Sequence, residues 1–135
     1  MKRESGTPLT SIGTLRDAFL VDRGAAEKSY LGRMLTVEAT VLRTGTSMYA
    51  TPIVEASDRP GGTLVAVFVL PFGRESEASF ERLKAFHPGD RILVTGECRM
   101  MSEPDGVLVF KDCVIEVDHP VAGPDSIIAE ILWKS

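Results

Sequence analysis

Four side chains in this sequence are of the kinds that bind zinc or act as nucleophiles: His87, Cys98, Cys113 and His119. Zinc sites place such ligands in closely spaced pairs, and no two of these residues have that spacing. A nucleophilic cysteine also needs a neighbouring base and an electropositive setting, whereas this part of the chain is acidic. We therefore expect no metal, no cofactor and no catalytic residue, and we expect both cysteines to be reduced core residues.

Two further groups of residues could carry chemistry, and each has a simpler structural interpretation. Residues 59–63 are rich in glycine, as phosphate-binding loops are. They lack the lysine and the spacing of a P-loop, and a predicted strand rather than a helix follows them, which favours a turn. Glu103 and Asp105 are a pair of carboxylates in another turn-forming segment, where solvation is the expected state. An enzyme is therefore the least favoured class of function.

The charge of the chain argues against a protein that binds phosphate backbones through a basic surface. The formal net charge is −4, and residues 89–135 carry 9 acidic against 4 basic side chains. Proteins that bind nucleic acids mostly cluster lysine and arginine, because counterion release supplies much of the affinity. We find no such cluster in this sequence.

Length and hydropathy indicate one domain without a membrane segment. The 135 residues are 44% hydrophobic and 25% charged, which is ordinary for a globular protein. No segment approaches the roughly 20 apolar residues that a membrane span requires. The first eight residues include two basic side chains but no apolar run behind them, so we expect a cytoplasmic protein that does not contact membranes.

The pattern of apolar residues predicts helices first and strands afterwards. Ser11 and Asp22 are candidate caps of two short helices that end before residue 33. From residue 35 the period changes from helical spacing to two, which is typical of half-buried strands. The predicted order is a strand over 35–41, a strand over 49–56, a strand over 64–70, a helix over 75–86, and strands over 89–98 and 107–115.

Three strands, a helix and two strands is the order of the OB-fold, a five-stranded Greek-key barrel. Four segments resemble the tRNA-anticodon-like OB-fold family, namely residues 26–33 (AEKSYLGR), 37–41 (VEATV), 89–98 (GDRILVTGEC) and 110–113 (FKDC). The resemblance spans roughly residues 15–117 and implies an all-β fold with helical additions. The family name implies nucleic-acid binding, by analogy of fold.

This interpretation divides the chain into three parts. An N-terminal helical extension covers residues 1–33, the barrel covers residues 34–118, and a C-terminal tail with a short helix covers residues 119–135. The helix of the barrel is expected between its third and fourth strands, as in other OB-folds.

The last predicted strand contains an irregularity that the sequence itself reveals. Leu108 and Phe110 share one parity along the strand, whereas Cys113 and Ile115 share the other. All four are typical core residues, so one extra residue must be inserted between the two pairs. We predict a β-bulge at Lys111-Asp112.

OB-folds that bind oligonucleotides use the outer face of their second and third strands and the two loops beside it. A hairpin in which Glu55 opposes Val65 and points to solvent makes this face aliphatic. The face is then formed by Ile53, Val65, Val67 and Val69. Such a face needs a cover, either the helices of residues 11–31 or another protein, and we favour the second.

We therefore predict a non-catalytic binding module that interacts with a protein partner or with a second copy of itself, or that has an accessory role. The alternative is single-stranded nucleic acid, DNA or RNA, bound through the barrel face. For that ligand Arg43 and Tyr49, near the first loop, are the candidate contacts, because cations and stacking aromatics bind single strands.

Overall fold

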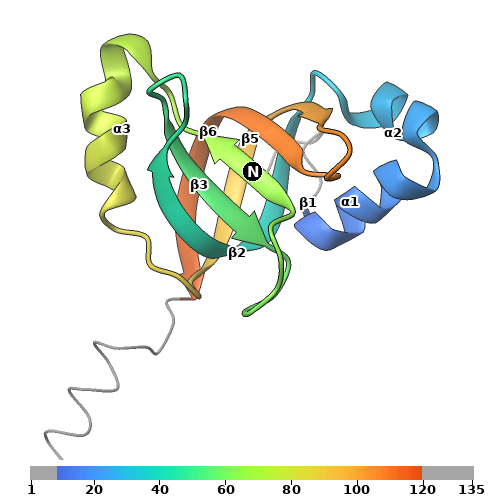
Figure 1. Ribbon diagram of the computed structural model, residues 1–135, viewed down its shortest axis with the longest axis horizontal. Helices are drawn as coiled ribbons and strands as arrows, with labels where there is room; N and C mark the ends of the chain where they lie inside the picture. The colour runs from blue at the N-terminus through green and yellow to red at the C-terminus, as the bar shows by residue number, and fades with distance from the viewer. Residues whose placement is uncertain (1–8, 120–135) are drawn as a thin grey trace, which may run out of the picture.

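A closed β-barrel with helices at opposite ends forms the part of the chain that the computed structural model describes, residues 9–119 (Figure 1). The strands are β1 (Leu9–Ser11), β2 (Met34–Thr46), β3 (Pro52–Ser57), β4 (Ala66–Val69), β5 (Arg91–Met101) and β6 (Leu108–His119). The helices are α1 (Ile12–Val21), α2 (Arg23–Tyr30), the short 3-10 helix η1 (Gly73–Glu75) and α3 (Ser76–Leu83). The predicted C-terminal helix lies outside the described residues.

The strand order is β1-β2-β3-β4-β6-β5, and a further pairing of β2 with β5 closes the barrel. The β4–β6 pair is parallel, whereas the other pairs within the barrel are antiparallel. This is the five-stranded OB barrel that the sequence predicted, so the fold class is confirmed. A short strand was not predicted: β1 adds to the outside of β2 in parallel, and its three residues are too few to show a period of two.

Both predicted helix caps are confirmed. The Ser11 side chain accepts a hydrogen bond from the Thr14 amide at 3.1 Å, at the start of α1. The Asp22 carboxylate accepts one from the Ala25 amide at 3.1 Å, at the start of α2. These bonds satisfy amides that have no partner inside the first turn of a helix. Each helix therefore begins where the sequence places its cap.

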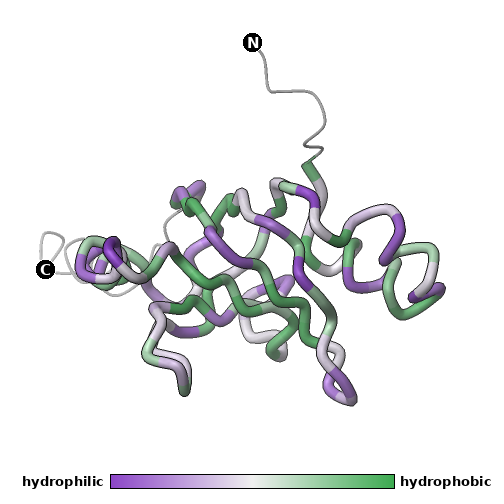
Figure 2. The backbone as a smooth tube through the Cα atoms, turned by 90° about the horizontal axis from the view of Figure 1, so that it is seen from above, coloured by the Kyte–Doolittle hydropathy of each residue, from purple (hydrophilic) through white to green (hydrophobic). Residues whose placement is uncertain are grey.

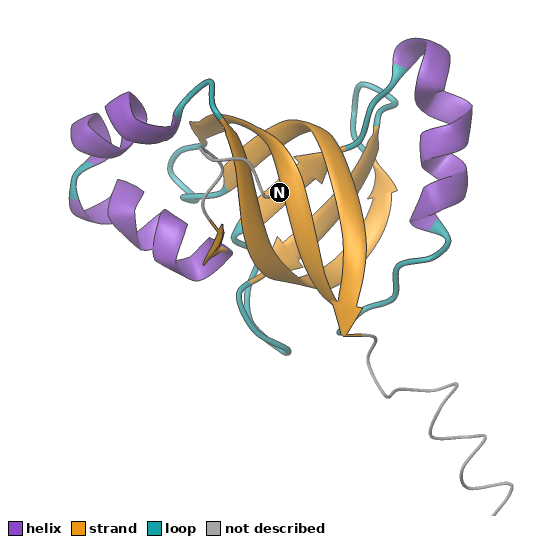
Figure 3. Cartoon of the chain, turned by 180° about the vertical axis from the view of Figure 1, so that it is seen from behind, coloured by secondary structure: helices purple, strands orange, loops and turns teal. Residues whose placement is uncertain are grey.

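The two ends of the barrel are covered by different helices, which lie on opposite sides of the sheet in Figure 3. Helix α1 contributes Ile12, Leu15 and Phe19 to the core, and all three are buried. At the other end the core includes Leu83 of α3 and Phe86 beyond it. Figure 2 shows hydrophobic residues along the strands between these ends. The barrel interior is therefore continuous with the apolar side of each helix.

The β-bulge predicted in the last strand is confirmed. Thr95 of β5 pairs with Val114, but Glu97, two residues along, pairs with Lys111, three residues away on β6. Asp112 lies in the segment of β6 that contains the extra residue, and its φ of 55° is in the left-handed region. The bulge turns Leu108, Phe110 and Cys113 all toward the core, where each is at most 1% exposed.

The bulge also brings β6 unusually close to β5 at Gly96. A Cβ atom on Gly96 would lie 2.6 Å from the Cys113 sulfur and 3.2 Å from the Lys111 carbonyl oxygen. Real Cβ atoms essentially never approach another atom to 2.6 Å, so position 96 accepts only glycine unless Cys113 or the strands shift.

We predict that Gly96→Ala lowers the free energy of unfolding by about 1–3 kcal/mol, because the added methyl group overpacks the core. Thermal or denaturant unfolding measures the change. The matched control is Gly45→Ala in β2, where a Cβ would meet nothing within 4 Å. Equal stability of the two variants would show that the strands adjust freely at residue 96.

Candidate functional site

The candidate site is the outer face of β3 and β4. Ile53 pairs with Val69 and Glu55 pairs with Val67, so these four side chains point to the same side of the sheet. The sequence placed Glu55 opposite Val65, a register two residues away. A register shift of two residues keeps the same side chains on the same face, so this error does not by itself change which residues form the predicted face.

The structure places the four residues of the predicted face in different environments. Val67 and Val69 are half-buried on the outer face. Ile53 lies on the same face but is only 7% exposed. Val65 is 5% exposed and belongs to the core, so its assignment to the outer face is wrong. The accessible aliphatic surface is narrower than the sequence indicated.

The reason for the error at Val65 is an irregular start of β4. The Val65 amide donates to the Ala56 carbonyl oxygen at 2.8 Å, although Ala56 is also the pairing partner of Ala66. Two consecutive residues therefore face one residue of β3, as at a β-bulge, and the alternation of side chains is broken.

A residue that the sequence analysis missed extends the face. Val109 of β6 pairs with Val67 in parallel register and is half-buried. Together Val67, Val69 and Val109 form the aliphatic part of the outer face. Because β4 and β6 are far apart in the sequence, no local pattern could have placed Val109 there.

An ion pair occupies the β2 side of the same face. Arg43 and Glu55 are pairing partners on β2 and β3, and their side chains lie 2.5 Å apart between Nη2 and Oε1. The Arg43 side chain is exposed, whereas that of Glu55 is largely buried. The predicted nucleic-acid contact Arg43 is thus already neutralised by a carboxylate of the face.

Tyr49, the other predicted nucleic-acid contact, lies in the turn between β2 and β3 and is 80% exposed. It belongs to the same hairpin as Arg43, but it lies in the turn rather than on the strand. The bond from the Leu70 amide to the Pro52 carbonyl oxygen, at 3.0 Å, places this turn beside the end of β4. The β2–β3 turn therefore borders the face at one end.

The β5–β6 turn, residues 102–107, lies near the start of β4, since the Leu108 amide donates to the Val65 carbonyl oxygen at 2.9 Å. Helices α1 and α2 pack against this turn rather than over the face (Figure 1). The Arg16 Nε atom donates to the Gly106 carbonyl oxygen at 2.7 Å. Nη2 of Arg23 donates to the Met101 carbonyl oxygen at 2.7 Å, and Nη1 pairs with Glu103.

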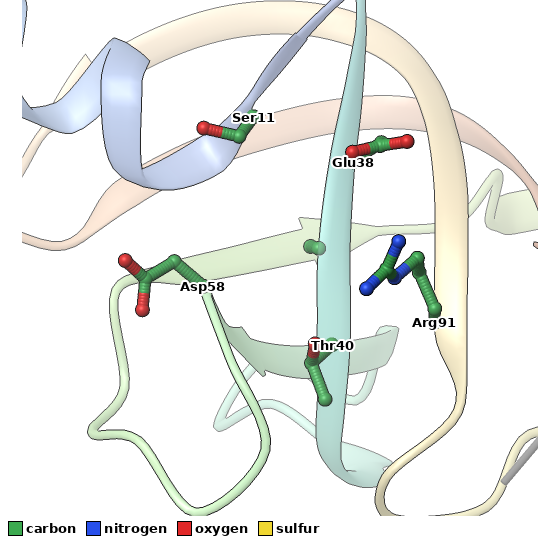
Figure 4. Close-up of a pocket in the computed structure, with 6 residues that line it drawn as sticks. Ser11, Glu38, Thr40, Asp58 and Arg91 are labelled. Atoms are coloured by element: carbon green, nitrogen blue, oxygen red, sulfur yellow. The ribbon is translucent and has the colours of Figure 1, made fainter.

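A small polar hollow lies elsewhere on the barrel (Figure 4), with a volume of about 90 Å³. It is lined by Ser11, Glu38, Ala39, Thr40, Asp58 and Arg91. In this view Asp58 and Arg91 lie on opposite sides of β2. Such a volume holds only a few water molecules. Among the described residues, no three histidine, cysteine or acidic side chains are grouped so that they could hold a metal ion.

Both cysteines are buried and free, as the sequence predicted. Burial raises the pKa of the Cys98 thiol to about 11, and the nearby Glu97 carboxylate adds to the effect. Burial also raises the pKa of the Cys113 thiol. Thiolates are the reactive form, so neither residue is set up as a nucleophile near neutral pH.

Comparison with known proteins agrees with this architecture. The model of the tRNA_anti-like family matches residues 3–114, which is most of the chain. The protein therefore belongs to the tRNA_anti-like family, whose members are tRNA-anticodon-like OB-fold domains. Comparison with curated protein sequences found no match to this chain.

Three solved structures share the fold. A Klebsiella pneumoniae lipoprotein described as nucleic acid-binding has a TM-score of 0.60 and 16% identity, over 82% of this chain and 92% of that chain. A Leishmania major protein described as an aspartyl-tRNA synthetase has a TM-score of 0.58 and 10% identity, over 88% of this chain but only 22% of its own. The OBody AM3L09, bound to hen egg-white lysozyme, has a TM-score of 0.51 and 20% identity, over 67% and 86%.

Within residues 9–119, no helix has the length and apolar character needed to cross a membrane.

We predict that Arg16→Met lowers the free energy of unfolding by about 1.5–3 kcal/mol, because a hydrogen bond from a charged donor usually contributes this much to stability. The same change should speed amide exchange in residues 102–107, because the Gly106 carbonyl loses its anchor. Hydrogen exchange read by mass spectrometry checks this, with Arg82→Met on α3 as the control at the other end of the barrel. Unchanged exchange in this turn would show that Arg16 does not restrain it.

Proposed function

We propose that this protein is a non-catalytic binding module, and that the outer face of β3 and β4 binds an uncharged surface of a protein partner. The observation that carries the proposal is the Glu55 carboxylate, which lies within the face and is paired with Arg43. A phosphate backbone would meet this carboxylate and would have to separate the ion pair, which costs free energy.

The neighbouring side chains are consistent with a protein ligand. Val67, Val69 and Val109 are half-buried aliphatic residues on the same face as Glu55, and aliphatic groups contribute to interfaces by losing contact with water. The OBody structure supports the proposal by analogy, since that OB barrel is bound to a protein. Near the other end of the face Arg23 is paired with Glu103, so this arginine is not free to bind phosphate either.

The second candidate ligand is single-stranded nucleic acid. The tRNA_anti-like family and the lipoprotein described as nucleic acid-binding favour it by analogy of fold. The specific observation in its favour is Tyr49, whose exposed ring is free to stack on a base. The two candidates differ in what a new positive charge on the face would do.

We predict that the wild-type protein binds single-stranded oligonucleotides no more tightly than about 10⁻⁴–10⁻⁶ M at physiological salt, the range of non-specific binding. Fluorescence anisotropy with labelled oligo-dT and oligo-U measures the dissociation constants. Nanomolar affinity for either strand would overturn the protein-binding proposal and favour nucleic acid.

We further predict that Val67→Lys removes the protein partner that affinity capture recovers with the wild type, while the melting temperature stays nearly unchanged. The lysine would lie at a half-buried position, where its ammonium group reaches water in the free protein. In an apolar interface it would lose that water without gaining a counter-charge, because Glu55 is already paired with Arg43. The matched control is Val114→Lys on β6, a position that is 52% exposed and pairs with β5. Retention of the partner by Val67→Lys, together with tighter oligonucleotide binding, would contradict the proposal.

A further inference from the structure

We propose that the β2–β3 turn, residues 47–51, is a preformed anchor that inserts Tyr49 into an uncharged pocket of the protein partner. Met48 would contact the rim of that pocket. This inference rests on the proposed function and names the part of the site that carries most of the affinity. Four features of the turn support it: its hydrogen bonds, its backbone conformation, its exposure and its lack of charge.

The turn is held together by its own hydrogen bonds. The Ser47 hydroxyl oxygen accepts bonds from the Tyr49 amide at 3.0 Å and from the Thr51 amide at 3.3 Å, and it lies 2.6 Å from the Thr51 hydroxyl oxygen. Backbone bonds join the Ser47 amide to the Thr51 carbonyl oxygen and the Ala50 amide to the Ser47 carbonyl oxygen, each at 2.9 Å. One serine therefore fixes the conformation of the whole turn.

The hairpin loop is a type I turn followed by a left-handed residue, and the chain has alanine rather than the usual glycine at that position. Ala50 has a φ of 64°, in the left-handed region that glycine adopts at no cost. Ala50 is exposed, so its methyl group does not repay the strain by packing in the core. Strained residues of this kind are concentrated at binding sites, where a fixed geometry is useful.

The turn presents two large side chains to solvent. Met48 is 86% exposed and Tyr49 is 80% exposed. The folded chain gains almost nothing from burying either side chain, so neither is needed for stability. Tyrosine is among the residues that most often dominate the affinity of protein interfaces, and a rigid loop lowers the entropy lost on binding.

The charge around the turn defines the chemistry of the partner. Residues 44–54 contain no charged side chain. The charges that flank this segment, Arg43 and Glu55, neutralise each other. A complementary pocket is therefore apolar and uncharged, and it accepts an aromatic ring and a thioether. A phosphate-rich ligand finds no matching cation here.

The other loop beside the face does not offer such an anchor. Arg16 and Arg23 tie the β5–β6 turn to the helices, and its Glu103 side chain is already paired. Of the two loops that border the face, the β2–β3 turn is therefore the one with large unpaired apolar side chains. We infer that the ligand contacts the face from this end.

The test is selection of a randomised peptide library, displayed on phage, against the full-length protein. Enriched peptides are then titrated against Tyr49→Ala, Ser47→Ala and the control Val21→Ala, which removes an equally exposed apolar side chain from α1. We expect Tyr49→Ala to weaken binding at least about tenfold. We expect Ser47→Ala, which keeps Tyr49 but frees the turn, to weaken it about threefold.

Melting temperatures of Tyr49→Ala and Val21→Ala should equal that of the wild type, so that lost binding is not lost folding. Faster amide exchange at Tyr49 and Thr51 in Ser47→Ala would identify Ser47 as a positioning residue. Unchanged affinity of Ser47→Ala despite faster exchange would overturn the claim that rigidity matters.

Four results would overturn the anchor itself. Peptides that lose affinity with Val67→Lys but not with Tyr49→Ala would support the face and remove the turn from the site. Peptides insensitive to both changes, or no enriched peptide at all, would contradict both proposals. Binding of oligo-dT that disappears in Tyr49→Ala would show that the turn stacks on bases, and the protein occupant would then be wrong.

Discussion

Closure of the barrel depends on β6, which pairs with both β4 and β5. Over residues 108–110 it pairs in parallel with β4, and along its length it pairs antiparallel with β5. The bulge at Asp112 lets the strand curve between these partners, and Gly96 leaves room for the Cys113 side chain on the inside of that curve. The β4–β6 pairing that closes the barrel also places Val109 beside Val67 on the outer face.

The helices determine which parts of the barrel surface stay open. Helix α1 closes one end through its apolar side, and arginines of α1 and α2 hold the β5–β6 turn by its carbonyl oxygens. Residues at and after the end of α3 contribute to the core at the other end. Because these elements lie at the ends, the β3–β4 face and the β2–β3 turn remain accessible. The ion pair across β2 and β3 then leaves the face without a net charge of its own.

Features that depend on neighbouring residues could be predicted from the sequence. The caps at Ser11 and Asp22 and the bulge at Asp112 follow from side-chain chemistry and parity within a few residues. Features that depend on pairing between distant segments could not. The core position of Val65 results from a local loss of register with β3, and the place of Val109 results from the parallel pairing with β4. The sequence identified Arg43 as a cation near the site but not the carboxylate that holds it.

The turn of residues 47–51 is held by hydrogen bonds between its own residues, and this affects how the sequence of such a protein can change in evolution. Its hydrogen bonds run from Ser47 to residues within the same segment, while its two largest side chains are exposed. Substitutions of the side chains at positions 48 and 49 therefore leave the side-chain hydrogen bonds of the turn and the core of the barrel unchanged. Under the proposed anchoring role, a lineage that keeps this barrel and its bulge could exchange one partner for another by changing two neighbouring codons.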